Sequence, residues 1–464
     1  MITNYIGFKI MKQFLSSLCI IAILSCSSGT PEPSLDNLQD DSSMNDFNIV
    51  LITIDTLRAD HLSCYGYERK TSPNIDKIAE KGIIFKNTTA TSSWTAPSMV
   101  SLLTSVYPIN HGVMHGLAIK KTIYGQEVFS DELTTLAHIL NTHGYTTFAA
   151  VSNLHLSEKF GFARGFDYFK CVLFPPAPLV NKIIYSWEDE IKKSDKYFLW
   201  IHYMDPHIPY HARNPWIDQY TSKALTQKLK LSKKSMNKIL ELIPMFEKDT
   251  QALSNLIALY DSEINYVDFY IGELIQKFEL DKNTLIIITS DHGEEFLEHG
   301  LLGHSNNLYQ ETIHIPLIVK LPHSTKKGTV EKLTNLVDIM PTILHVLDIS
   351  PPNQTLGTSV WEKKRKDYNF SELGKSKNHI IKTILTSEWK YIHNYNDETE
   401  QLYNIKSDPL ELSNLADKKT KQRNHLNEQL SNWVSHSRKY YTKRQPFHPS
   451  PKEKEKLKSL GYIQ

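Results

Sequence analysis

Carboxylate and imidazole side chains are concentrated between residues 291 and 304, where the chain reads Asp-His-Gly-Glu-Glu-Phe-Leu-Glu-His-Gly-Leu-Leu-Gly-His. Asp291 and His292 are adjacent, so a loop can turn both side chains onto one ion. Asp55, from a distant part of the chain, offers a further carboxylate. Oxygen and imidazole donors together suit a divalent cation. These residue types predict a metal centre held chiefly by Asp55, Asp291 and His292.

Short apolar segments precede these groups and must position them. Runs rich in β-branched and aromatic residues, as expected of strands buried on both faces, occupy residues 48–54, 197–203 and 284–289. Helical patterns lie between them, for example at 74–81, 133–143 and 262–278. This alternation predicts an α/β fold with a mostly parallel central sheet flanked by helices.

The carboxyl ends of parallel strands are where such sheets bind ligands. Asp55, His207, Asp291 and His292 all fall at or just after a predicted strand end. A polar residue after a strand is common, because chains turn there, but several of them at one edge predict a functional site.

Two further regions differ in character from the rest. Residues 212–252 are Lys-rich and amphipathic, and they predict inserted helices beside the His207 loop, either shaping a pocket or presenting a solvated face. After residue 350 short strand patterns are followed by a helical pattern at 417–438. We therefore expect a main domain at 47–350 and a small C-terminal α+β subdomain at 351–464.

The N-terminus predicts export. Lys9 and Lys12 precede an apolar run at 14–24, which is too short to span a bilayer comfortably. The run ends at Ile-Leu-Ser-Cys26, which resembles a bacterial lipoprotein processing site, so residues 1–26 are predicted to be a signal peptide and Cys26 the lipidated residue. Residues 27–46 then form a flexible tether. A plain secreted signal is the alternative to a membrane-anchored lipoprotein on the periplasmic or cell-surface side.

Composition excludes some partners. Lys and Arg number 52 against 51 Asp and Glu in 464 residues, so there is no general electrostatic footprint for nucleic acid. After the signal, the cysteines are Cys64 and Cys171, which we expect to be free thiols rather than a disulfide.

Several ordered segments resemble the sulfatase family, within the alkaline phosphatase superfamily, over nearly the whole mature chain. The matching segments are 54–66 (Ile-Asp-Thr-Leu-Arg-Ala-Asp-His-Leu-Ser-Cys-Tyr-Gly), 72–85, 205–210 (Asp-Pro-His-Ile-Pro-Tyr), 289–295 (Thr-Ser-Asp-His-Gly-Glu-Glu), 303–317, 337–343 and 402–415. Each is weak by itself, and their order and number make the match specific.

The chain departs from that family at the nucleophile. Sulfatases carry Cys or Ser in a Cys/Ser-x-Pro-Ser-Arg pattern and oxidise it to formylglycine, whereas here the chain reads Thr95-Ala-Pro-Ser-Met99. Thr95 cannot become that aldehyde, and Met99 replaces the arginine. Thr56 also replaces one partner of the family's Asp-Asp metal pair.

The resemblance implies a metal-dependent hydrolase of anionic esters, from a glycan, a lipid or a small molecule. A metal-activated Thr95 is a competent nucleophile. A phosphoester is favoured over a sulfate ester, because a sulfated threonine lacks the second hydroxyl with which an aldehyde hydrate expels sulfate. The divalent ion is calcium, manganese or zinc: calcium is usual in sulfatases, and manganese or zinc is commoner among threonine-using relatives.

The resemblance also suggests roles for the remaining candidates. His207 would protonate the leaving oxygen, and His304 would contact the anionic group or share that role. Thr56 would be a weak additional ligand, and Arg58 would stand in for the cation lost at Met99. His299 would join a second metal site or lie on the surface or in the second shell.

Three other interpretations stay open. One is a sulfatase that works without formylglycine. Another is a catalytically silent binding lipoprotein that recognises an anionic glycan or lipid. The third, a lipid head-group transferase, is disfavoured because such enzymes typically carry several membrane-spanning helices, and the sequence contains none.

Overall fold

The computed structural model describes residues 46–114, 118–120, 123–221, 239–376, 379–440, 443–447 and 450–459. The predictions for the signal peptide, Cys26 and nearly all of the tether lie outside the described residues. So do residues 222–238 of the Lys-rich stretch 212–252.

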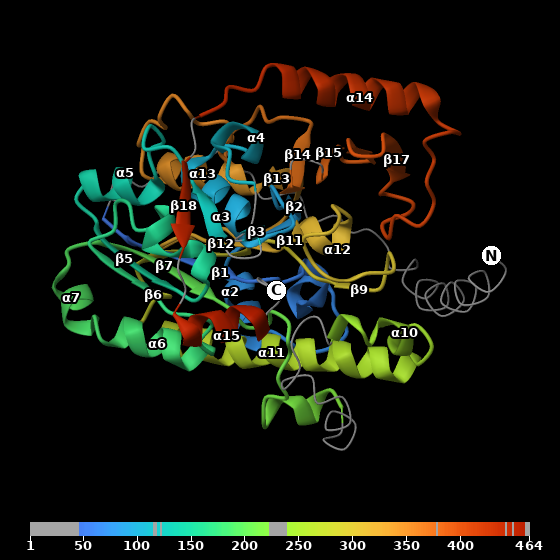
Figure 1. The fold of residues 1–464 in the computed structure, drawn as a ribbon. Coiled ribbons are helices and arrows are strands. Elements are labelled where there is room, and N and C mark those ends of the chain that lie inside the picture. Colours follow the sequence, from blue (N-terminus) through green and yellow to red (C-terminus); the bar gives the residue numbers. More distant parts are fainter. Residues whose placement is uncertain are drawn as a thin grey trace.

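A nine-stranded sheet forms the centre of the molecule (Figure 1). β1 (Asn48–Ile54) pairs in parallel with β7 (Tyr197–Tyr203) and with β8 (Thr284–Ser290). On the β7 side follow β5 (Thr146–Val151) and β6 (Tyr168–Cys171), also parallel. On the β8 side, β12 (Leu317–Lys320) is antiparallel to β8 and also to β2 (Ile83–Thr89). Two more strands pair with β2: β11 (His314–Ile315) is antiparallel to β2, and β13 (Gly328–Asn335) is parallel to β2. The predicted mostly parallel sheet is confirmed, with antiparallel pairs at one edge.

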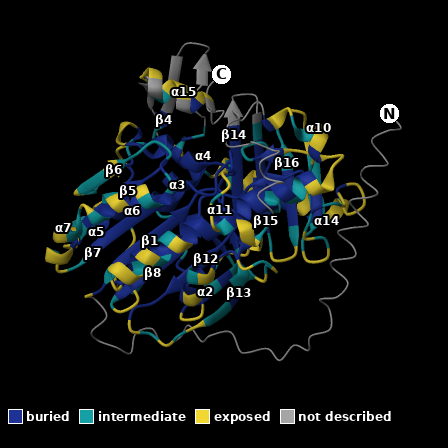
Figure 2. Ribbon diagram, turned by 90° about the horizontal axis from the view of Figure 1, so that it is seen from below, coloured by how far each residue is buried: buried dark blue, intermediate teal, exposed yellow. Residues whose placement is uncertain are grey.

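The centre of β1, from Ile49 to Ile52, is continuously apolar because both of its faces are covered. Ile49 and Leu51 belong to one hydrophobic cluster, and Val50 and Ile52 belong to the other. Successive side chains of a strand point to opposite faces, so a strand between two helical layers needs apolar residues at every position. Figure 2 shows the sheet strands as the buried centre of the molecule.

Helices cover both faces of the sheet. One face packs against α3 (Thr95–Thr104), α5 (Leu136–Thr142) and α13 (Ile339–Val346). The other packs against α2 (Pro73–Ala79), α6 (Ala177–Tyr185), α7 (Glu188–Lys193), α10 (Ile243–Phe246) and the long α11 (Thr250–Lys277), which runs along the lower side in Figure 1. The predicted helices at 74–81, 133–143 and 262–278 are present with shifted ends, and α11 begins earlier because Asp249 caps it.

A second, antiparallel sheet confirms the C-terminal α+β subdomain. Its strands, in order, are β14 (Asn369–Ser376), β15 (His379–Leu385), β16 (Trp389–Asn394) and β17 (Thr399–Asn404). Leu426 and Leu430 of α14 (Thr420–Ser435) pack on this sheet. The chain then returns to the main domain, where β18 (Lys443–Phe447) pairs with β4 (Ile123–Val128), which also pairs with β3 (Ala118–Lys120); α15 (Pro451–Ser459) follows.

The remaining elements are short. They are α4 (Pro108–His111), α12 (Gln310–Ile313), β9 (Glu295–Phe296), β10 (Leu302–Gly303) and the 3₁₀ turns Ala59–His61, Ser63–Tyr65, Leu154–Leu156, Glu158–Phe160, Trp216–Gln219 and Leu336–Asp338.

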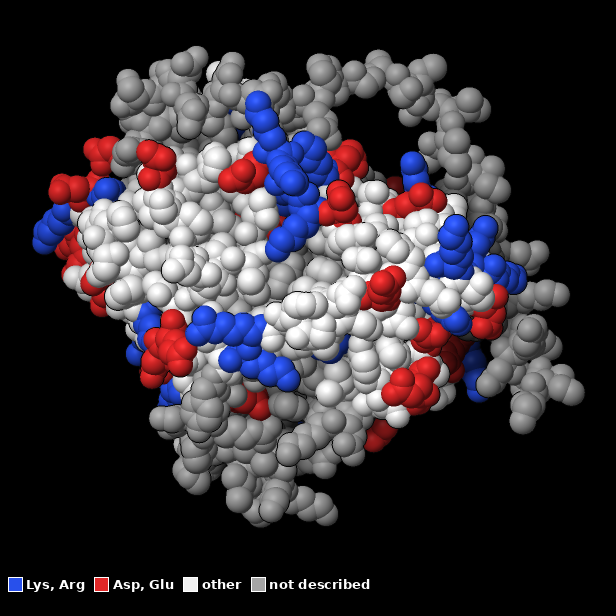
Figure 3. Space-filling model, turned by 90° about the horizontal axis from the view of Figure 1, so that it is seen from above, with Lys and Arg blue, Asp and Glu red and all other residues white. Residues whose placement is uncertain are grey.

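The distribution of surface charge and the state of the cysteines agree with the expectations from the sequence. On the face in Figure 3, basic and acidic residues are interspersed. Cys64 and Cys171 are both free and partly buried, as expected. None of the helices in the described ranges is long and apolar enough to cross a membrane.

Candidate active site

Asp55, Asp291 and His292 come together at the carboxyl ends of β1 and β8. Ile54 and Ser290 are paired in register, so the residues that follow them emerge side by side. Nε2 of His292 lies 3.4 Å from Oδ2 of Asp291 and 3.7 Å from Oδ1 of Asp55. One ligand-type atom from each residue lies within 4.8 Å of the others, and all three side chains are fully buried. We call these three residues the metal cluster.

The hydrogen bonds around the metal cluster leave one oxygen of each carboxylate available to a cation. Oδ2 of Asp55 accepts a hydrogen bond from Asn153 at 2.9 Å, and Oδ1 of Asp291 accepts one from the Thr56 backbone N–H at 3.2 Å. Within the described part of the chain, Oδ1 of Asp55 and Oδ2 of Asp291 have no hydrogen-bond partner. Buried carboxylate oxygens without partners are costly, so this arrangement fits a bound divalent ion. Nδ1 of His292 donates to the Gly293 carbonyl at 2.8 Å, which makes Nε2 the ligand atom.

Electrostatics point the same way. Burial would raise the pKa of Asp55, but the hydrogen bond with His202 and the charges of nearby histidines hold that pKa below its ordinary value. The pKa of Asp291 is raised, first by burial and then by the negative charge of Asp55. A cation between the two carboxylates would offset their repulsion and replace the lost solvation.

Thr95 lies against the metal cluster. Its Oγ1 is 3.5 Å from Oδ2 of Asp55 and 3.5 Å from Nε2 of His292. Thr95 is the first residue of α3, so the positive end of the helix dipole favours negative charge on its oxygen. The predicted nucleophile and the predicted ligands therefore share one site.

His207 and His304 complete the predicted group. Their ring centroids are 4.9 Å apart, and the ring of His304 is 4.5 Å from that of His292. Nδ1 of His207 hydrogen-bonds the Ile208 carbonyl, and Nδ1 of His304 lies 2.7 Å from Oε1 of Glu294. Burial lowers the pKa of His207 to about 4, against the opposing effect of the Asp55 charge.

Sequence reasoning missed four buried residues of this site: Asn153, His155, His202 and Glu294. Asn153 and His155 follow β5, so the same strand-end signal that identified Asp55 applied to them. His202 lies within β7, and its Nε2 is 3.2 Å from Oδ2 of Asp55. Glu294 lies inside the segment 291–304 and had no distinguishing signal within that acidic run.

Thr56 occupies a strained turn beside the metal cluster. Its φ is 58°, in the left-handed region that β-branched residues rarely adopt. The hydroxyl of Tyr260 donates to the Thr56 carbonyl at 2.7 Å and accepts from the Arg58 N–H at 3.0 Å, which holds the turn. Oγ1 of Thr56 is buried without a hydrogen-bond partner among the described residues, as a weak additional ligand would be.

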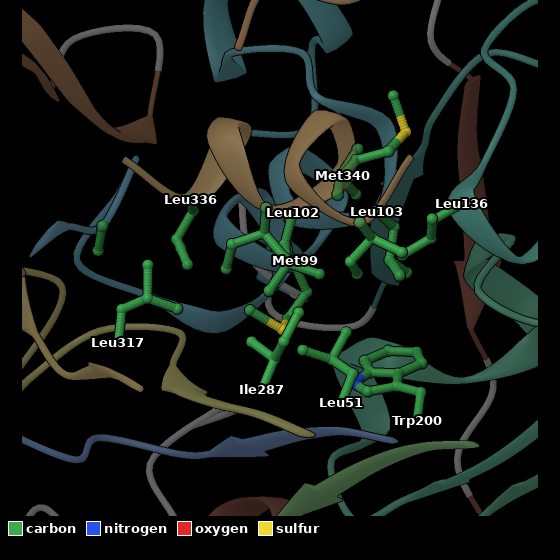
Figure 4. Packing of buried hydrophobic residues seen from close by; sticks show 14 of the residues in the cluster. Leu51, Met99, Leu102, Leu103, Leu136, Trp200, Ile287, Leu317, Leu336 and Met340 are labelled. Carbon is green, nitrogen blue, oxygen red and sulfur yellow. The ribbon is translucent and has the colours of Figure 1, made fainter. Parts of the chain in front are cut away.

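Arg58, the predicted substitute cation, is paired with acidic groups. Its guanidinium forms ion pairs with Asp60 at 2.7 Å and Glu298 at 2.6 Å, and it donates to the Glu294 carbonyl. Met99 is fully buried in the hydrophobic core, packed among residues such as Leu51 and Ile287 (Figure 4). The position of the family's arginine is therefore used here for packing.

His299 is engaged in a different network. It lies with Glu295 and Glu311 in a second group of metal-type donors. However, Nδ1 of His299 is 2.7 Å from Oε1 of Glu311, and Nε2 is 3.2 Å from the Glu411 carbonyl. Because each ring nitrogen of His299 faces a protein oxygen, a hydrogen-bonding role is favoured over a second metal site.

The chain is similar to known sulfatases over most of its length. Residues 47–349 match the sulfatase family, and residues 298–439 match the C-terminal region of N-sulphoglucosamine sulphohydrolase. The uncharacterized sulfatase YidJ of Escherichia coli K12 is 22% identical over 436 residues, which cover 80% of this chain and 83% of that protein. The N-acetylglucosamine-6-O-sulfatase of Bacteroides thetaiotaomicron is 24% identical over 479 residues, with 80% and 83% covered.

Solved structures show the same fold. The phosphonate monoester hydrolase of Agrobacterium radiobacter superimposes with a TM-score of 0.69 at 19% identity, covering 87% of this chain and all of that one. The family match spans most of the chain, and the predicted ester-hydrolase architecture is present. The chain belongs to the sulfatase family and is a hydrolase of sulfate or phosphate esters.

Proposed function

We propose that this hydrolase uses Thr95 as a metal-activated nucleophile and prefers phosphoesters to sulfate esters. The observation that supports the proposal is the position of Oγ1 of Thr95, 3.5 Å from both Asp55 and His292 at the start of α3. A threonine there can accept a phosphoryl group from the substrate and release it to water. A sulfated threonine, in contrast, has no second hydroxyl with which to expel sulfate. The resemblance to a phosphonate monoester hydrolase is consistent with phosphorus chemistry.

The residues that would hold the ion are Asp55 through Oδ1, Asp291 through Oδ2 and His292 through Nε2, with Oγ1 of Thr56 as an additional donor. When bound, the ion lowers the pKa of the Thr95 hydroxyl and offsets the charge of the ester. An imidazole beside two carboxylates suits manganese or zinc better than calcium, which takes oxygen ligands.

The reaction then needs two displacements at phosphorus. Deprotonated Oγ1 of Thr95 bonds to phosphorus while the bond to the leaving alcohol oxygen breaks, and that oxygen takes a proton from His207. Water next bonds to phosphorus and gives a proton to His207, while the bond between phosphorus and Oγ1 breaks and regenerates the free threonine alkoxide. Burial keeps His207 neutral in the free protein, and an anionic ester seated beside it would raise its pKa.

The test compares turnover of aryl sulfate, phosphate monoester and phosphodiester substrates with calcium, manganese, magnesium and zinc. Metal-dependent phosphoester cleavage is expected, and Thr95→Ala should reduce it at least about 1000-fold. Thr104→Ala, which removes a buried hydroxyl from the other end of α3, is the matched control and should retain turnover. Unchanged turnover in Thr95→Ala would exclude Thr95 as the nucleophile.

The same assay separates the alternatives. A preference for sulfate would make the chain a sulfatase that works without formylglycine, as its sulfatase relatives suggest. Silence on every substrate would favour the binding-protein interpretation.

We also propose that the protein is exported and anchored to the membrane by lipid at Cys26, on the strength of the segment 14–26. A Cys26→Ala protein should leave the membrane fraction. Equal membrane association of the variant and the parent would argue against lipidation.

A further inference from the structure

Asn153 lies beside the candidate nucleophile and is held in one orientation. Its Oδ1 accepts a hydrogen bond from the His155 backbone N–H at 3.1 Å, where the turn Leu154–Leu156 begins. An amide whose oxygen is engaged in this way directs its NH₂ group to the other side. That group donates to Oδ2 of Asp55 at 2.9 Å and to Oγ1 of Thr95 at 3.3 Å.

The backbone around Asn153 is fixed as well. Asn153 follows β5 by two residues, and its carbonyl accepts hydrogen bonds from the Leu156 N–H at 3.0 Å and from the Cys171 thiol at 3.4 Å. The side chain is fully buried. The amide donor is therefore aimed at Oγ1 of Thr95 before any substrate binds.

The charge on Oγ1 changes during the proposed reaction. Oγ1 attacks as an alkoxide, and it becomes negative again when its bond to phosphorus breaks. A donor already directed at this atom in a buried site stabilises both states without reorganisation. Since the same amide also binds Oδ2 of Asp55, it keeps Oδ1 turned toward Asp291 and His292.

We infer that Asn153 is a further catalytic residue, which stabilises the negatively charged Oγ1 of Thr95 and orients Asp55. The inference rests on the proposed function, because it gives Asn153 a part in the reaction of Thr95. Its effect belongs mainly to kcat, since the amide contacts the nucleophile and a predicted metal ligand.

The test measures kcat, KM and manganese affinity for Asn153→Ala and Asn153→Asp in the purified full-length protein. At saturating manganese, kcat of Asn153→Ala should fall about 10- to 100-fold with little change in KM, as expected for loss of a hydrogen bond to a charged atom. The kcat of Asn153→Asp should fall at least as far, because this change removes the hydrogen-bond donor and adds a second carboxylate beside Asp55. Titration calorimetry of manganese should show a much smaller change in affinity than in kcat.

Asn181→Ala is the matched control. Asn181 is another fully buried asparagine, and its side chain bonds the Tyr203 hydroxyl and the Tyr270 carbonyl. This variant should melt at a lower temperature and keep its kcat at saturating manganese. If saturating manganese restores kcat of Asn153→Ala, or if kcat never falls, Asn153 acts only on metal binding or on stability and the inference is wrong.

A melting-temperature cycle separates this inference from the proposed function. Thr95→Val, Asn153→Ala and the double variant should give non-additive shifts, because the first change already removes the shared hydrogen bond. A parent that hydrolyses no ester would refute the proposed function and with it the catalytic role. Additive shifts would refute the contact itself, whatever the turnover of the parent.

Discussion

Thr56 shows how one residue sets the properties of the metal cluster. The family carries a second acid at this position, and here a threonine is held at φ 58° with its hydroxyl buried beside Asp55 and Asp291. A neutral hydroxyl adds little charge to the ligand set. Hard oxygen ligands with more negative charge bind calcium more tightly.

Replacing Thr56 by Asp should therefore raise calcium affinity, with an expected fall in Kd of about tenfold. Aspartate also tolerates the left-handed backbone better than threonine does. Calorimetric titration with calcium measures the change. Thr56→Asn has the same shape without the charge and should gain much less; equal affinities for the parent and Thr56→Asp would place Thr56 outside the ligand set.

Metal removal should affect stability as well as turnover. Oδ1 of Asp55 and Oδ2 of Asp291 are buried without hydrogen bonds, so the folded chain carries uncompensated carboxylate atoms when the ion leaves. An ion present at 100 times its Kd stabilises the folded state by about 2.7 kcal/mol. Melting curves with manganese and with a chelator should differ accordingly. Asp291→Asn should abolish the difference, and identical curves for the parent would refute the metal centre.

At the scale of elements, the loop after β8 depends on the close approach of two backbones. A Cβ on Gly293 would lie 2.1 Å from the Glu311 carbonyl oxygen, and the Gly293 N–H donates to the Thr312 carbonyl at 2.8 Å. Only glycine allows β8 to deliver Asp291 and His292 while α12 packs against the same loop.

Gly293→Ala should lower the free energy of unfolding by about 3 kcal/mol and weaken manganese binding, because the loop after β8 must move away from α12. Urea denaturation and calorimetry measure the two effects. Gly300→Ala is the control: its Cβ would meet nothing within 4 Å, so it carries only the strain of φ +85°. A Gly293→Ala protein as stable as Gly300→Ala would contradict this explanation.

At the scale of the whole molecule, a buried polar network connects the main domain to the C-terminal sheet. Nζ of Lys390 in β16 lies 2.8 Å from Oε1 of Glu411, and Oε2 of Glu411 accepts from the Gln310 N–H at 2.7 Å. His299 bridges Glu311 and the Glu411 carbonyl and stacks on Tyr309 with centroids 3.5 Å apart. The C-terminal subdomain thus contacts α12 and His299, which follow the loop after β8, and stabilises their positions.

His299 should make the stability that this network provides depend on pH. Burial alone would lower the pKa of His299, but the hydrogen bond and charge of Glu311 raise it above its ordinary value. A raised folded-state pKa adds stability that is fully present below the unfolded pKa of about 6.5, and that stability is lost as pH rises through the folded value. Urea denaturation at several pH values should show this loss in the parent and a flatter profile in His299→Gln. Equal slopes would exclude His299 as the titrating group.

The amino-acid sequence was sufficient to predict the mostly parallel sheet and the family, and it singled out Asp55, Asp291 and His292 as candidate ligands. β1, β7 and β8 were predictable because strands covered on both faces are largely apolar, and each of these apolar runs ends just before Asp55, the His207 loop or Asp291. The order of the family motifs identified Thr95 as the nucleophile candidate, since the neighbouring Pro97 and Ser98 fix the frame.

Which polar side chains lie near Thr95 depends on contacts between distant parts of the chain. Asn153 had only the strand-end signal, and His202 and Glu294 had no distinguishing signal in sequence. They become neighbours of the site because β7 and β8 pair with β1 and β5 pairs with β7. Likewise, Arg58 was singled out by its nearness to Asp55 in sequence, and its ion pairs with Asp60 and Glu298 became visible only in the fold. The direction of a side chain depends on partners brought from distant parts of the chain, and local sequence does not contain that information.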